Sequence, residues 1–193
     1  MPSRHGSLEP CLAHKPHFAL SGCPLYILPC DGGNAPNRIR LDLRFMINDV
    51  YNEKILDLAG NIPRLGRLQE PDASATAHSK LCGSTVTVDL KLDNGAVSDF
   101  AHDVKACALG QASSSIMARH VIGAKPDELR GLRDTVRKML KENGAPPAGK
   151  WADIAVLEPV RDYKARHAST MLTFDAVVAA LDKIEAEKKQ AAE

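Results

Sequence analysis

The sequence lacks any apolar run long enough to cross a bilayer, for which about 20 consecutive residues are needed. It also lacks the charged-then-apolar start and small-residue cleavage site of a secretory signal. Its net charge is only +1, so no strong field attracts nucleic acid or an anionic membrane. Aromatic residues make up only 4%, which leaves few rings for base stacking. We therefore expect a cytoplasmic protein without a nucleic-acid or membrane partner.

The five cysteines form no regular disulfide framework, and the spacings of the first three match no zinc motif. They are Cys11, Cys23, Cys30, Cys82 and Cys107, an odd number that is unevenly spread. A reducing compartment fits this pattern better, and cysteines there more often serve metal binding or catalysis. The alternative for each cysteine is a structural role, because free cysteine is commonly a small buried hydrophobe.

The first 45 residues differ in composition from the remainder. They contain six of the twelve prolines and show no sustained helical or strand period. We expect residues 1–45 to be a disordered or irregular extension, residues 46–187 to form one domain, and residues 188–193 to be a polar tail. The abrupt change of composition at Met46 allows an alternative, in which the natural chain begins there; the mass of the intact native protein would decide.

Strand-like alternation of apolar and polar side chains is clearest in the middle of the chain. Asn94-Gly95 marks a tight hairpin turn, because both residues tolerate positive φ. Irregular spacing of the apolar residues in the return strand predicts a β-bulge near residues 100–102. The expected strands cover residues 73–79, 84–92 and 96–105.

Helical periodicity flanks these strands on both sides. Asn48 or Asp49 is expected to cap the first helix, and a short apolar stretch from Trp151 to Pro159 is expected to cover the core. Hairpin-linked strands followed by helices predict an α+β fold, a three-stranded antiparallel sheet with helices packed on one face. The expected helices cover residues 50–59, 110–122, 127–143 and about 168–187.

The predicted meander brings Cys82 and Cys107 to the same end of the sheet. Cys82 precedes the second strand, and Cys107 follows the third and precedes a helix. The positive end of that helix favours a thiolate, the form that binds soft metals or accepts sulfur. Lys105 could assist thiolate formation or pair with an acidic group. The pair therefore predicts a metal or sulfur site, with two structural cysteines as the alternative.

Several motifs occur together along the chain. The most specific is the run from Cys107 to Ser115, and Cys82-Gly83 precedes it. The chain from about Asp49 to Ile184 resembles the NifU N-terminal/IscU/SufU family of scaffolds, on which iron–sulfur clusters are assembled. The resemblance implies a SufE/NifU-like fold. Further matching segments are Tyr51-Asn52, Asn61–Pro63, Leu157–Val160 and Met171–Val177.

This resemblance implies a scaffold that binds iron or a transient cluster, of the 2Fe–2S type, through Cys82 and Cys107 rather than an enzyme. It implies a cysteine desulfurase and iron–sulfur acceptor proteins as partners. A chaperone is a further implied partner, because Leu157–Arg161 resembles the chaperone-recognition stretch of the IscU branch.

The ligand set departs from that of the family. Ser84 stands where the family has an aspartate, and Ser169 or Ala168, depending on alignment register, stands where it has a third cysteine. Two thiolates do not complete a cluster that takes four protein ligands. A homodimer could share one cluster, the site could hold zinc or nothing, or side chains of the same chain could contribute. We expect His167 as a metal ligand, with His102 or Asp103 as other candidates, and Asp103, Lys105 and Ser169 as supporting residues.

Two other functions remain open at this point. One is a zinc-bound sulfurtransferase of the SufU type, which needs a sulfur-accepting thiol. The other is an interaction module without metal, which predicts that serine variants of both cysteines behave like the wild type.

Overall fold

The computed structural model describes residues 50–191. The expected extension, residues 1–45, lies outside the described residues, as do Asn48 and Asp49. Asn52 caps the first described helix, α2 (Glu53–Gly60), because its side chain accepts a hydrogen bond from the Ile55 N–H. The helix therefore begins three residues later than the expected start at residue 50.

Three antiparallel strands form the sheet in the order β1-β2-β3. They are β1 (Ala73–His78), β2 (Thr85–Asp93) and β3 (Ala96–Lys105). The side chains of Val86, Val88 and Leu90 are fully buried on one face, as their alternation predicts. Asn94 and Gly95 have positive φ values of 50° and 78°, which confirms the predicted hairpin turn.

The β-bulge lies at a different place from the one expected. Lys91 pairs with Asp99, but Leu92 pairs with Val97, so Ser98 is the additional residue on β3. The expectation of a bulge at residues 100–102 is therefore wrong. The insertion at Ser98 is also the reason that Val97 and Phe100, three positions apart, are both buried.

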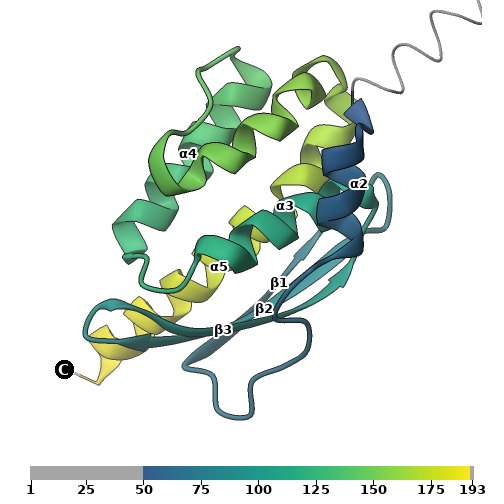
Figure 1. Ribbon diagram of the computed structural model, residues 1–193. Coiled ribbons are helices and arrows are strands. Elements are labelled where there is room, and N and C mark those ends of the chain that lie inside the picture. The colour runs from purple at the N-terminus through teal and green to yellow at the C-terminus, as the bar shows by residue number, and fades with distance from the viewer. Residues whose placement is uncertain (1–49, 192–193) are drawn as a thin grey trace, which may run out of the picture. The chain divides into compact units, whose positions relative to one another are not determined.

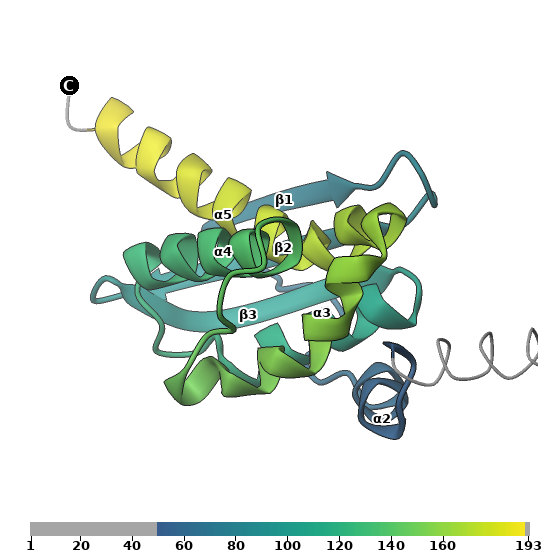
Figure 2. The ribbon, with the colours of Figure 1, turned by 90° about the horizontal axis from the view of Figure 1, so that it is seen from above.

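The helices cover one face of this sheet, and the predicted α+β fold is confirmed (Figure 1 and Figure 2). The long helix α5 packs against β1 and β2, α3 against β3, and α4 against α5. The apolar residues at helical spacing in the predicted helix 127–143 are all buried, namely Leu129, Leu132, Val136 and Leu140. None of the helices in residues 50–191 has the length and apolar character needed to cross a membrane. The remaining bounds are α3 Ala108–His120, α4 Pro126–Lys141, η1 Gly149–Asp162 and α5 Lys164–Gln190.

The segment expected to be a short apolar stretch is the 3₁₀-helix η1. A 3₁₀-helix has three residues per turn, so residues three apart lie on the same face. Every third residue of η1 is buried, namely Trp151, Ile154, Leu157 and Val160. Helix α5 begins soon afterwards, four residues before the expected start, and continues to Gln190, within the expected polar tail.

An ion pair between the exposed Arg67 and the buried Asp89 attaches the loop before β1 to the other face of the sheet. Asp89 is fully buried and accepts hydrogen bonds from the Arg67 side chain at 2.7 and 2.8 Å and from Ser74 Oγ at 2.6 Å. Burial opposes the charged form, but hydrogen bonds from Arg67, Ser74 and the Leu68 N–H outweigh it, so the pKa of Asp89 is lowered. The loop is therefore held against the face opposite the helices at Asp89 (Figure 1).

Candidate functional site

Cys82 and Cys107 lie at the same end of the sheet. Cys82 is in the turn between β1 and β2, and Cys107 lies between β3 and α3. Antiparallel pairing of Thr85 with Lys105 places the start of β2 beside the end of β3. Both thiols are free; Cys82 is exposed and Cys107 is half-buried. The structure thus contains the two-thiol arrangement that the meander predicts.

Two serine hydroxyls lie beside the Cys82 thiol. Its Sγ is 3.2 Å from Ser79 Oγ and 3.0 Å from Ser84 Oγ. Gly83, with φ of 69°, allows the turn to close, and its N–H donates to the Ser79 carbonyl at 2.9 Å. Hydrogen bonds from Ser79 and then Ser84, together with the Arg166 charge, lower the pKa of Cys82 to about 7. A substantial fraction of Cys82 is therefore thiolate at neutral pH.

Cys107 is the N-cap residue of α3, and its side chain makes no capping hydrogen bond to the helix. Its Sγ instead lies 3.4 Å from Ser169 Oγ on α5. Ser169 is fully buried and donates its hydroxyl to the Arg166 carbonyl at 3.0 Å. The structure therefore places Cys107 beside Ser169, and the preceding turn of the same helix carries Arg166, whose charge acts on Cys82.

Close packing of α3 against α5 maintains this contact. A Cβ atom on Gly110 would lie 2.7 Å from Ala106 Cβ and 3.1 Å from the Ser169 carbonyl oxygen, so only glycine fits without a shift. Ser114 shares a hydrogen bond with Thr173 across the two helices, and both residues are fully buried. The buried serines that follow Cys107 are therefore part of the packing between α3 and its neighbours.

His167 lies close to the thiols in sequence but has other partners. It is buried, and its Nε2–H donates to the Val160 carbonyl at 3.1 Å and the Arg161 carbonyl at 3.0 Å. In the described part of the chain, no group of three or more His, Cys, Asp or Glu side chains could hold a metal ion. The structure therefore does not bring His167 into a common cluster with the two cysteines.

The remaining candidates lie on β3. Asp103 and Lys105 form an exposed ion pair at 3.6 Å, so Lys105 has the acidic partner that the sequence left open. His102 is fully buried, and its Nε2–H donates to the Pro63 carbonyl at 3.0 Å. Burial lowers the pKa of His102. None of these three side chains has a hydrogen bond or ion pair to a cysteine within residues 50–191.

The predicted chaperone-recognition stretch, Leu157–Arg161, lies in η1. The side chains of Leu157 and Val160 are buried, and Arg161 forms an ion pair with Glu158. A partner that binds the apolar side chains of this stretch would therefore require η1 to detach from the core.

The chemistry of this site is that of two thiols with hydroxyl neighbours. Two thiolates are soft ligands that suit iron, zinc or a cluster edge, and residues 50–191 supply two cysteines toward a four-ligand set. Sequence reasoning did not identify the hydroxyls of Ser79 and Ser84 as partners of Cys82. The signal that could have identified them is their position: Ser79 and Ser84 flank a tight turn that contains Cys82 and Gly83.

Known proteins match the described domain. The model of the NifU-like N terminal domain matches residues 50–189. The iron-sulfur cluster assembly scaffold protein IscU of Thermotoga maritima is 28% identical over 135 residues, covering 70% of this chain and 94% of that protein. The corresponding IscU protein of Streptococcus pyogenes is 24% identical, covering 70% and 84%. The crystal structure of a nitrogen-fixing NifU-like protein (N-terminal) from Brucella abortus is 67% identical, with a TM-score of 0.72, covering 73% of this chain and 98% of that one.

Proposed function

The chain belongs to the NifU N-terminal/IscU-like family of iron–sulfur cluster assembly scaffolds, and on this premise we propose that it holds iron or a transient cluster through Cys82 and Cys107. The observation that carries the proposal is the placement of both free thiols at one end of the sheet, each beside a serine hydroxyl. The cluster is cargo, assembled on the thiols and passed to an acceptor protein.

The two thiols have separate roles in this proposal. Cys82, exposed and with a pKa of about 7, is the thiolate that first meets iron or sulfur. Cys107, fixed at the start of α3, is the ligand whose position the fold sets. Arg166 supplies a positive charge near Cys82 that favours its anionic form.

With only two cysteine ligands in residues 50–191, binding by this part of one chain is weak. Ser169 contacts Cys107, but a serine hydroxyl stays protonated at neutral pH and is a poor iron ligand. A homodimer in which each chain donates two thiols would supply the four ligands that a 2Fe–2S cluster takes. His167 is the alternative ligand, and its recruitment would require its Nε2 to leave the Val160 and Arg161 carbonyls.

Anaerobic reconstitution with ferrous iron and sulfide tests this function. We expect visible charge-transfer absorption that is lost in Cys82→Ser and in Cys107→Ser. The matched control is Ser98→Ala, which alters an exposed residue of the same hairpin and should keep the colour. A colourless product without bound iron in every oligomeric state would contradict the proposal.

A sulfurtransferase of the SufU type is the second candidate, and the exposed, low-pKa thiol of Cys82 favours it. Incubation with a cysteine desulfurase and free cysteine, followed by peptide mass spectrometry, would locate a persulfide. A persulfide at Cys82, together with bound zinc in place of iron, would favour this candidate over the scaffold.

A further inference from the structure

A second feature of the domain is an open cavity of about 900 Å³ between α4, the end of η1 and the start of α5. Four arginine and lysine side chains line it, Arg137, Lys141, Arg161 and Lys164, and so does the buried His167, the alternative metal ligand named above. Only two carboxylates, Asp162 and Asp175, share the lining, which leaves an excess of positive charge. A concave surface with one predominant charge attracts groups of the opposite sign.

This cavity lies on the other side of α5 from the thiols. Ala168 and Met171 line the cavity, whereas Ser169 contacts Cys107 and Thr173 contacts Ser114 of α3. With 100° per residue, Ala168 and Met171 lie on roughly the opposite face of the helix from Ser169 and Thr173. A ligand in the cavity would therefore not occupy the space over the cysteines.

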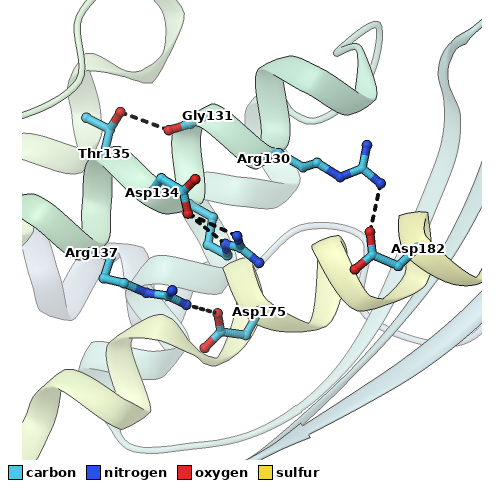
Figure 3. Close-up of polar contacts among 8 residues, drawn as sticks. Arg130, Gly131, Asp134, Thr135, Arg137, Asp175 and Asp182 are labelled. Carbon is cyan, nitrogen blue, oxygen red and sulfur yellow. Dashed lines mark hydrogen bonds and ion pairs between the residues drawn. The ribbon is translucent and has the colours of Figure 1, made fainter.

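Elsewhere along α4, arginine side chains are matched by carboxylates. Arg130 forms ion pairs with Asp182 at 2.7 Å and with Glu185 at 2.8 Å. Arg133 pairs with Asp134 at 3.0 Å. Figure 3 shows this row, with Arg130 reaching from α4 to Asp182 on α5. The charges of Arg130 and Arg133, which lie outside the cavity, are thus matched by carboxylates.

Within the cavity, only some of the basic side chains have a carboxylate partner. Arg137 pairs with Asp175 at 3.2 Å, as Figure 3 shows, and Arg161 pairs with Glu158. Among residues 50–191, Lys141 and Lys164 form no ion pair. Burial raises the pKa of Asp175, although the charges of Arg137, Arg133 and Lys141 oppose the rise. Lys141 at the end of α4 and Lys164 at the start of α5 are therefore available to an external anion.

We propose that this cavity binds an acidic segment of a partner protein, whose carboxylates pair with Lys141 and Lys164. Both lysines are exposed, and so are Asn143, Asp162 and Ala168 of the lining. A small molecule there would remain largely in water, whereas binding sites for small molecules usually enclose most of the ligand surface. A peptide segment can lie across an open cavity and pair with both lysines at once.

Fluorescence anisotropy with fluorescein-labelled hexaglutamate and the full chain tests this proposal. We expect saturable binding that weakens as salt is added. The double variant Lys141→Glu/Lys164→Glu should bind about tenfold more weakly or not at all. The matched control, Lys188→Glu/Lys189→Glu, makes the same change of net charge on the exposed end of α5 and should bind like the wild type.

The Asp175→Asn variant provides a test in the opposite direction. Removal of this carboxylate frees Arg137 for the ligand, so we expect binding of hexaglutamate to tighten about threefold. Circular dichroism would establish that each variant is folded.

Three results would overturn the proposal. The first is the absence of saturable binding to the wild type. The second is an equal loss of affinity in the two double variants, which would indicate attraction by net charge alone. The third is displacement of the peptide by an equal concentration of inorganic phosphate, which would indicate a site for free anions.

Discussion

Cys82 and Cys107 lie at the same end of the sheet but in different surroundings. Cys82 is exposed in a turn, and two serine hydroxyls and the Arg166 charge lower its pKa to about 7. Cys107 is half-buried at the start of α3, where the packing of α3 against α5 holds it next to Ser169. The difference shows how one site can combine a reactive thiol with a fixed one.

The largest expected effect is the pH dependence of Cys82 alkylation. Because the pKa of Cys82 is lowered to about 7, thiolate predominates above that pH and decreases below it. The alkylation rate with iodoacetamide should fall roughly 50-fold between pH 7 and pH 5, as the thiolate fraction does. Ser84→Ala removes a hydroxyl that stabilises the thiolate, so it should move the midpoint upward.

Peptide mass spectrometry after timed alkylation measures each cysteine separately. Cys82 should react faster than the half-buried Cys107 at pH 7. Equal alkylation rates for Cys82 and Cys107 would contradict the proposed difference in their reactivity. An unchanged midpoint of the Cys82 pH profile in Ser84→Ala would contradict the role given to the Ser84 hydroxyl.

The next effect concerns the residue that contacts Cys107. Ser169→Ala removes this neighbour and should weaken iron binding about tenfold, the usual lower range for loss of a group beside a metal ligand. Ser169→Cys places a third thiol there and should slow the loss of iron to a chelator. Chelator-transfer kinetics after anaerobic loading provide the measurement. Identical release from wild type, Ser169→Ala and Ser169→Cys would show that this position lies outside the metal site.

The smallest effect is on stability and tests the packing that fixes Cys107. Gly110→Ala introduces a Cβ that would lie 2.7 Å from Ala106 Cβ, so the free energy of unfolding should fall. We expect a net loss of about 1 kcal/mol, because the strain exceeds the gain in helix propensity.

Gly131→Ala is the matched control. Gly131 lies in α4 with no atom within 4 Å of an added Cβ. Its replacement should raise the free energy of unfolding by about 0.5–1 kcal/mol. Urea denaturation of both variants measures these changes, and a stabilised Gly110→Ala would refute the close approach of α3 and α5.

The sequence predicts the parts of the fold in which a single period dominates. The alternation in β2, the Asn94-Gly95 turn and the apolar stripe of α4 all agree with the structure. The first helix was expected three residues too early, because Asn48, Asp49 and Asn52 are all acceptable caps and only the fold selects among them. The bulge is at Ser98 and not at residues 100–102, since periodicity locates an irregularity only to within a few residues.

The candidate site was predicted in part for similar reasons. The position of both cysteines follows from the order of the strands, which the sequence predicts from the hairpin turn at Asn94-Gly95. The partners of His167 depend on how η1 meets α5, a tertiary contact without a periodic signal. The same limit applies to Ser169, whose contact with Cys107 joins residues 62 positions apart.

The most direct test uses the variant in which Cys11, Cys23 and Cys30 are all replaced by serine, so that Cys82 and Cys107 are the only thiols. Iron content and visible absorption are measured after anaerobic reconstitution with ferrous iron and sulfide. We predict that this variant binds iron and is coloured, and that adding Cys107→Ser abolishes both properties. Colourless, iron-free protein from the two-thiol variant would contradict the assignment of Cys82 and Cys107 as the iron-binding pair.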